Sequence, residues 1–261
     1  MKRLLSAIVL LLIVIGAVWF LPPLGTVVIA VGVLSVAIVE YVNLAEHAGI
    51  EIVSVPLWIS SIGVAGVVAF VPDLLPFGLT VALLLVSSVK LSRGRGKKSV
   101  LTDTAASIFP VIYLSVPIGI LIALHLDEGP EVVSLLLVTV IASDAAQYYG
   151  GRNFGRRLLA PRISPKKTVE GAACGILVGS LVLGFDPAGW LSAFPLELRF
   201  FLGAAVASVG IAGDLFESSL KRASGIKDSS ALIPGHGGVL DRIDALVFAT
   251  PLYFFAVRWL G

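Results

Sequence analysis

The sequence predicts an all-α, polytopic integral membrane protein with about nine transmembrane helices. Of its 261 residues, 57% are hydrophobic and only 14% are charged. Soluble domains carry roughly 25% charged residues, so this composition excludes an ordinary soluble enzyme. Several apolar stretches also reach the roughly 20 residues that a helix needs to cross a bilayer.

The candidate spans are delimited by hydrophobic runs and by the proline and glycine residues that interrupt them, such as Pro72 and Gly129-Pro130. We predict spans over residues 4–21, 24–39, 52–71, 74–91, 104–124, 132–149, 169–185, 196–215 and 241–260. The first span follows Met1-Lys2-Arg3 and resembles a signal peptide. Because no small-x-small cleavage site follows it, we interpret it as a retained span. The seventh span carries Gly171, Gly175 and Gly179, a spacing that predicts close packing against a neighbouring helix.

The charges of the connecting loops predict the orientation. With nine spans and a cytoplasmic N-terminus, the C-terminus lies outside, and only Arg199 and Arg258 of the 19 basic residues fall on the outer side. The outer loops are acidic instead, with Asp127, Glu128, Glu131, Asp186 and Glu197. This segregation follows the positive-inside rule. We therefore predict one membrane domain over 1–261, in which 1–131 holds spans one to five and 132–261 holds the catalytic helices and cytoplasmic loops.

Four aspartates interrupt or border apolar runs toward the predicted cytoplasmic side: Asp144, Asp214, Asp241 and Asp244. A charged residue in a span is costly and is retained for a partner or a function. Converging carboxylates repel unless cations bridge them, and Mg²⁺ prefers such oxygen ligands together with substrate phosphates. The alternative interpretation is that each aspartate caps a helix or pairs with an arginine, such as Arg242 beside Asp241.

Two basic segments surround these aspartates in the sequence. The loop from Arg162 to Glu170 carries Ser164, Lys166, Lys167 and Glu170, and either lysine can clamp a polyphosphate. Its simpler interpretation is an inside-positive loop. The run from 218 to 244 adds a second basic cluster and the turn Gly235-His236-Gly237-Gly238. Glycine amides can form an anion-binding nest, although a flexible connector has the same composition.

The run from 218 to 244 also resembles the signature of the phosphatidate cytidylyltransferase (CDP-diacylglycerol synthase) family. The fixed positions of that signature are met by Ser218, Lys221, Arg222, Lys227, Asp228, Ser230, Pro234, His236, Gly237, Gly238, Asp241, Arg242 and Asp244. Upstream, Gly213-Asp214 and the segment from Ser164 to Gly171 look like further family motifs. The sequence departs from the family pattern after Asp144, where Ala145, Ala146 and Gln147 replace a Thr-Gly-Ala run. The resemblance covers roughly residues 144–244.

This resemblance implies a nucleotidyltransferase that transfers a cytidylyl group from CTP to phosphatidic acid, giving CDP-diacylglycerol and pyrophosphate for phospholipid synthesis. It implies catalytic roles for Lys167, Lys221, Arg222, Lys227, Asp228 and His236. Substrate binding is expected from Ser164, Lys166, Glu170, Ser218, Gly237, Gly238 and Arg242. Mg²⁺ is expected at Asp144, Asp214, Asp241 and Asp244. A second cation is also expected, and a monovalent ion is one candidate for it.

The expected partners are CTP, phosphatidic acid and membrane lipids, with a homodimer implied by the resemblance and no nucleic acid. We expect the protein in the inner (cytoplasmic) membrane with its active site facing the cytoplasm. A CTP-dependent lipid or polyprenol kinase is the main alternative function. A CDP-alcohol phosphotransferase is disfavoured because the sequence lacks the motif that this class of enzyme requires. An ion-coupled transporter is disfavoured because the polar residues gather on one side of the membrane.

Overall fold

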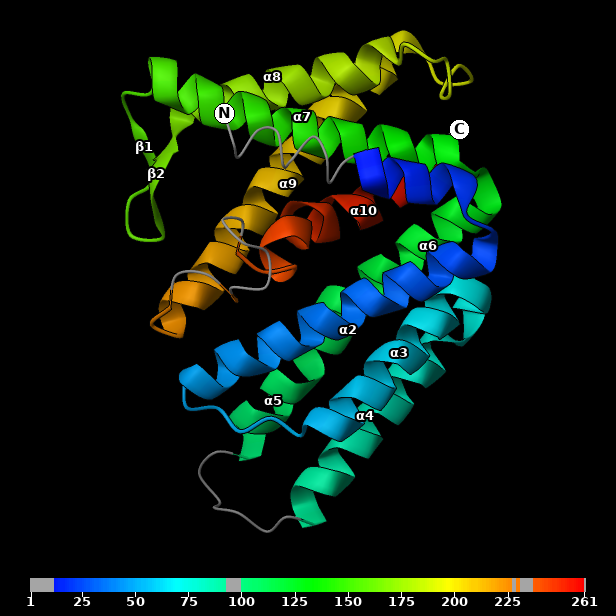
Figure 1. Cartoon of the computed structure of the whole chain (residues 1–261), viewed down its shortest axis with the longest axis vertical. Coiled ribbons are helices and arrows are strands. Elements are labelled where there is room, and N and C mark those ends of the chain that lie inside the picture. Colours follow the sequence, from blue (N-terminus) through cyan, green and yellow to red (C-terminus); the bar gives the residue numbers. More distant parts are fainter. Residues whose placement is uncertain (1–11, 93–99, 227–228, 231–236, 261) are drawn as a thin grey trace. The chain divides into compact units, whose positions relative to one another are not determined.

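The computed structural model describes residues 12–92, 100–226, 229–230 and 237–260, and these are mostly helical (Figure 1). Six helical segments are long and apolar enough to cross a membrane: Pro23–His47, Pro72–Ser92, Val100–Glu128, Pro130–Phe154, Leu196–Ala223 and Leu240–Leu260. Ser54–Phe70 and Val169–Phe185 are shorter apolar helices, and residues 12–20 are also helical. Every predicted span therefore contains helix within the described residues, and six of them have membrane-crossing length.

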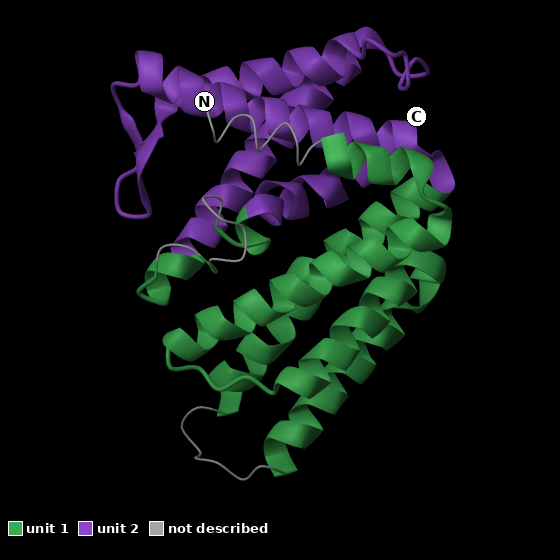
Figure 2. Ribbon diagram, in the orientation of Figure 1, with its two compact units in different colours: residues 1–126, 220–241 green, residues 127–219, 242–261 purple. Residues whose placement is uncertain are grey.

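The chain divides into two compact units (Figure 2). Unit 1 contains residues 1–126 and 220–241, and unit 2 contains residues 127–219 and 242–261. The division falls inside two helices, α9 (Leu196–Ala223) and α10 (Leu240–Leu260). As a result, the signature run contributes residues to both units.

Unit 1 is built from the N-terminal helices. They are α2 (Pro23–His47), α3 (Ser54–Phe70), the short 3₁₀ helix η1 (Pro72–Leu74), α4 (Leu75–Ser92), α5 (Val100–Pro110), the π-helical η2 (Val111–Ser115) and α6 (Val116–Glu128). The π-helical turn follows Pro110, which lacks the N–H that a regular helix requires. Lys90 on α4 is buried and lies 2.8 Å from Asp103 Oδ2 on α5, so an ion pair joins these two helices.

Unit 2 begins with α7 (Pro130–Phe154), followed by the strands β1 (Leu158–Ala160) and β2 (Ser164–Thr168) and by α8 (Val169–Phe185). The strands form an antiparallel hairpin, which is the departure from an all-helical fold among the described residues. Helices α7 and α8 pack side by side (Figure 1). A Cβ atom added at Gly171 would lie 2.7 Å from the Gln147 carbonyl oxygen, and one at Gly175 would lie 3.0 Å from that of Ser143. The close packing predicted from the glycine spacing is confirmed.

Helices α9 and α10 also approach closely within unit 2. A Cβ at Gly213 would lie 2.5 Å from the Asp244 carbonyl oxygen, so only glycine fits at this crossing. The rings of Phe216 and Phe248 are 5.5 Å apart and pack beside it. This crossing sets the positions of Asp214 on α9 and Asp244 on α10.

Candidate active site

Three of the predicted aspartates belong to unit 2 and come from three helices. Asp144 lies on α7, Asp214 on α9 and Asp244 on α10, and their carboxylate charges act on one another. A fourth acidic residue, Glu217, is fully buried on α9, and its charge also acts on Asp244. Of these four residues Glu217 and Asp244 are buried, whereas Asp214 is half-buried and Asp144 is exposed. Because like charges repel, nearby cations stabilise the ionised form of this cluster.

Lys167 supplies one such cation. Its ammonium group forms an ion pair with Asp214 Oδ2, and the two side chains are 14% and 28% exposed. The charges of Lys167 and Arg242 also act on Asp144. Adjacent residues of a strand point to opposite faces, and accordingly Lys166 on the same strand is exposed. Of the two lysines that the sequence offered, Lys167 is the one paired with a carboxylate of this cluster.

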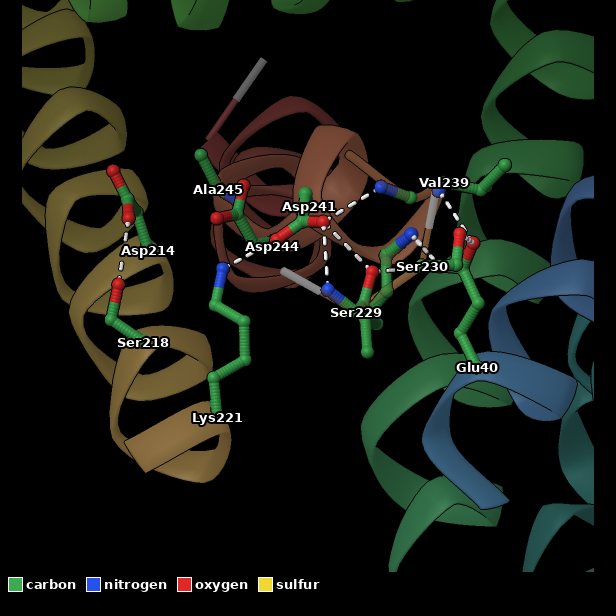
Figure 3. A network of polar contacts seen from close by, with 12 residues as sticks. Glu40, Asp214, Ser218, Lys221, Ser229, Ser230, Val239, Asp241, Asp244 and Ala245 are labelled. Atoms are coloured by element: carbon green, nitrogen blue, oxygen red, sulfur yellow. Dashed lines mark hydrogen bonds and ion pairs between the residues drawn. The ribbon is translucent and has the colours of Figure 1, made fainter. Parts of the chain in front are cut away.

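These carboxylates make few further hydrogen bonds with the residues that the structure describes. Ser218 donates a long hydrogen bond of 3.5 Å from its hydroxyl to Asp214 Oδ1 (Figure 3). The backbone N–H of Ala245 donates to Asp244 Oδ1 at 2.7 Å. An ionised carboxylate offers about four lone-pair sites. Asp214 and Asp244 therefore keep acceptor capacity for a further ligand.

The donor chemistry of the cluster fits Mg²⁺, which prefers carboxylate oxygens. Within the described parts of the chain, however, no group of three or more His, Cys, Asp or Glu side chains has the arrangement of a ready metal site. Asp214 is instead neutralised by the ammonium group of Lys167. A metal ion that binds Asp214 thus has to share or exchange this partner.

Asp241 lies in unit 1, at the first turn of α10, and its surroundings are different. Its Oδ1 forms an ion pair with Lys221 from the last turn of α9. Its Oδ2 accepts hydrogen bonds from the Gly238 N–H at 2.7 Å, the Ser229 N–H at 3.1 Å and the Ser229 hydroxyl at 2.8 Å. Asp241 thus ties the end of α9 and the start of α10 to the segment between them.

The structure adds Glu40 to this region, a residue to which the sequence analysis gave no role. Glu40 is buried on α2, and its carboxylate accepts hydrogen bonds from residues of the signature run (Figure 3). The predicted second span ended at Val39, whereas α2 continues to His47. The available signal was an acidic residue set between Val39 and Tyr41 in an otherwise apolar run.

Glu170 lies in the first turn of α8, outside the six candidate spans. Its Oε2 accepts hydrogen bonds from the backbone N–H groups of Arg156 at 3.0 Å and Arg157 at 3.2 Å. Glu170 and Arg156 also line a surface hollow with Asn153, Phe154 and Gly155.

The other predicted residues are distributed as follows. Ser164 is half-buried on β2, and Arg222 and Arg242 are exposed on α9 and α10. Gly237, three residues before the start of α10, has a left-handed φ of 77°. Gln147 is buried where α7 meets α8, with Ala145 and Ala146 half-buried beside it. Lys227, Asp228 and His236 lie outside the described residues.

Apolar helices that carry clustered carboxylates and lysines define an integral membrane protein with a polar site, and ionisable residues in such helices indicate a functional site. The sequence profile of the cytidylyltransferase family matches residues 1–260, and the chain therefore belongs to this family. The resemblance inferred from residues 144–244 is thus confirmed and extended to nearly the whole sequence.

Individual relatives agree with this assignment. A phosphatidate cytidylyltransferase of Helicobacter pylori is 39% identical over 157 residues, which cover 59% of this chain and 58% of the relative. One of Aquifex aeolicus is 49% identical over 113 residues, covering 43% and 41%. One of Pseudomonas aeruginosa is 36% identical over 208 residues, covering 70% and 76%. The chain thus spans less than two thirds of the length of several curated relatives it matches, including that of Helicobacter pylori.

Proposed function

We propose that this protein transfers a cytidylyl group from CTP to phosphatidic acid and releases pyrophosphate, producing CDP-diacylglycerol. The observation that carries the proposal is membership of the cytidylyltransferase family over residues 1–260. The grouping of Asp144, Asp214 and Asp244 with Lys167 supports it, because polyphosphate substrates require both metal-binding carboxylates and cationic side chains.

The chemistry is an in-line displacement at phosphorus. A phosphate oxygen of phosphatidic acid attacks the α-phosphorus of CTP and forms the new P–O bond. The bond between the α-phosphorus and the oxygen that bridges to the β-phosphate breaks, and pyrophosphate leaves with that electron pair. No strong general base is needed, because a phosphate monoester with a second pKa of about 6 is already ionised at neutral pH.

The basic side chains have the role of offsetting the charge that grows on pyrophosphate. We assign this role to Lys167, Lys221 and Arg222, with Lys227 and His236 as further contributors from the signature. Preorganised cations of this kind stabilise the transition state more than the ground state, which is the condition for a higher rate. Ser164, Lys166, Ser218 and the glycines before α10 remain the proposed substrate contacts.

We assign Mg²⁺ to Asp144, Asp214 and Asp244, with Asp241 as a further predicted ligand. When bound, the ion supplies positive charge to the phosphate oxygens of CTP. The residues of the chain orient the substrates: the carboxylates hold their cations, and Lys167 can turn from Asp214 to a phosphate group.

The proposed arrangement in the membrane has nine spans, a cytoplasmic N-terminus and an outer C-terminus. The loop charges support it, because only Arg199 and Arg258 of the 19 basic residues then lie outside. The site faces the cytoplasm, where CTP is available. A homodimer is the proposed assembly, on the strength of the family resemblance.

Product analysis tests the reaction. Purified protein in detergent micelles is supplied with phosphatidic acid, Mg²⁺ and CTP labelled at either the α- or the γ-phosphorus. The proposal predicts α-label in the lipid and γ-label in pyrophosphate, in equal amounts. A lipid kinase would instead place the γ-label in the lipid and release CDP. That result, or the absence of turnover in protein that is folded and monodisperse, would reject the proposal.

A further inference from the structure

Glu40 is an acidic side chain that is 3% exposed on a helix whose other buried residues are mainly apolar. A buried carboxylate is retained only where hydrogen bonds or cations compensate its lost hydration. Glu40 obtains this compensation from residues 189 to 200 positions later in the sequence. All of these residues belong to unit 1.

Each oxygen of Glu40 has two potential donors. Oε1 accepts from the Ser230 hydroxyl at 2.6 Å and from the Val239 N–H at 3.0 Å. Oε2 accepts from the Leu240 N–H at 2.7 Å, and the Ser229 hydroxyl lies 3.1 Å from it. Leu240 is the first residue of α10, so Glu40 occupies the place of a helix cap contributed by a distant part of the chain. An acceptor-only group with two oxygens is suited to four donors.

The Ser229 hydroxyl connects Glu40 with the signature aspartate. It lies 3.1 Å from Glu40 Oε2 and 2.8 Å from Asp241 Oδ2, and its single proton can be shared between them (Figure 3). Asp241 in turn holds Lys221. A continuous chain of polar contacts therefore runs from α2 through Ser229 to the Asp241–Lys221 pair.

Gly238 provides independent support for this arrangement. A Cβ atom at Gly238 would lie 2.1 Å from Ser229 Oγ and 2.4 and 2.5 Å from the two oxygens of Glu40. These distances are far shorter than any van der Waals contact. A side chain at position 238 would therefore have to displace Glu40 and Ser229 from these contacts.

We propose that Glu40 is a positioning residue of the active site: it anchors the segment that precedes α10 and, through Ser229, orients Asp241 and Lys221. This inference rests on the proposed cytidylyl transfer, to which it adds a required contribution from the N-terminal helices. Glu40 need not touch substrate. It acts by fixing the positions of the signature residues Asp241 and Lys221.

The sharpest variant is Glu40→Gln, which keeps the size of the side chain and replaces one acceptor oxygen with an NH₂ group. The backbone N–H that donated to the replaced oxygen then faces another donor, whereas the serine hydroxyl beside it can rotate and accept from the new NH₂ group. The matched control is Glu46→Gln on the same helix, because Glu46 is exposed. Both variants are compared with wild type for monodispersity and thermal stability in detergent.

The first readout is hydrogen–deuterium exchange, which is independent of activity. We expect the Val239 and Leu240 amides to exchange faster in Glu40→Gln than in wild type, with no change in Glu46→Gln. The second readout is steady-state kinetics: Glu40→Gln should lower kcat by about 10- to 100-fold, as expected for loss of charge-assisted hydrogen bonds, with KM for both substrates changed less than about threefold.

A double-mutant cycle with Ser230→Ala then tests coupling. Ser230 is expected to act through Glu40, so Glu40→Gln/Ser230→Ala should lose little more kcat than Glu40→Gln alone. Unchanged amide exchange in Glu40→Gln would overturn the anchoring, and faster exchange with wild-type kcat would overturn the positioning role. If wild type itself lacks cytidylyl transfer, the proposed function fails, while the exchange experiment still decides whether Glu40 anchors the segment.

Discussion

The two groups of acidic residues differ in how their oxygens are used. In unit 1, Glu40 and Asp241 are surrounded by hydroxyl and backbone donors, and Lys221 completes the shell of Asp241. In unit 2, the contacts of the Asp214 and Asp244 carboxylates with described residues are an ion pair with one lysine, a long hydrogen bond from one serine and a hydrogen bond from one backbone N–H. Carboxylates that are fully engaged by donors fix a backbone, whereas carboxylates with open lone pairs can take a cation. Asp241 and Asp244, which lie three residues apart in one signature, thus have different surroundings.

The largest effect is expected from Asp244→Asn. The substitution keeps the shape of this buried side chain and removes the charge that the cluster offers to a cation. We expect kcat to fall by about 1,000-fold or to undetectable levels, in line with loss of a principal electrostatic element of a site. Pyrophosphate release measures the effect, and Asp241→Asn should cost less because its oxygens are already engaged by donors. Equal activity of Asp244→Asn and wild type would contradict the assignment.

Lys167→Ala should have the next largest effect. It removes the cation paired with Asp214, and we expect kcat/KM for CTP to fall by about 100-fold. Lys166→Ala is the matched comparison, because Lys166 is the exposed neighbour on the same strand and should cost less than about tenfold. A larger loss in Lys166→Ala would mean that the hairpin presents its other face to the substrate.

Gly238→Ala should lower both stability and activity. The added methyl group would overlap with Ser229 and Glu40, so the segment has to move, and we expect a loss of about tenfold or more in kcat together with a lower Tm. Gly32→Ala provides the control on α2, because a Cβ at Gly32 meets no atom within 4 Å. Wild-type behaviour of Gly238→Ala would show that the contacts around Glu40 do not constrain this turn.

Asp103→Asn should affect stability without affecting catalysis. Its partner Lys90 is 4% exposed and keeps a second ion pair with Glu51 at 3.3 Å, so the loss should be smaller than the about 3 to 5 kcal/mol typical of removing one member of an isolated buried ion pair. We expect a lower Tm in detergent while the kcat of the remaining folded protein stays within about threefold of wild type. The exposed Asp73→Asn serves as control. A selective loss of kcat would place this pair in the catalytic machinery.

Hydropathy was sufficient to predict where the helices lie, because an apolar run of this length satisfies its backbone hydrogen bonds in a membrane by forming a helix. It placed their ends less well. The predicted span 24–39 stops short of the end of α2 at His47, and the predicted span 196–215 stops short of the end of α9 at Ala223. A helix can continue past the apolar core of the bilayer, where hydropathy no longer marks it. Glu40, Ser218 and Lys221 therefore lie within helices rather than in loops.

The pairings within the site required the structure. The hairpin at 158–168 was missed because Ser-Pro-Lys-Lys-Thr has neither the alternation nor the β-branched content of a typical strand. The catalytic, substrate-binding and metal-binding roles of the side chains that were singled out stay predictions. Lys167 pairs with Asp214, and Lys221 pairs with Asp241. These pairings depend on contacts between distant segments, which spacing along the chain does not specify.

The most direct test of the account is divalent-cation binding by the carboxylates of unit 2. Mn²⁺, as a spectroscopic substitute for Mg²⁺, is titrated into the purified protein and followed by electron paramagnetic resonance. Asp244→Asn should bind Mn²⁺ at least about tenfold more weakly than wild type, whereas Glu46→Gln should match wild type. Wild-type Mn²⁺ affinity in Asp244→Asn would contradict the claim that these carboxylates hold the cation.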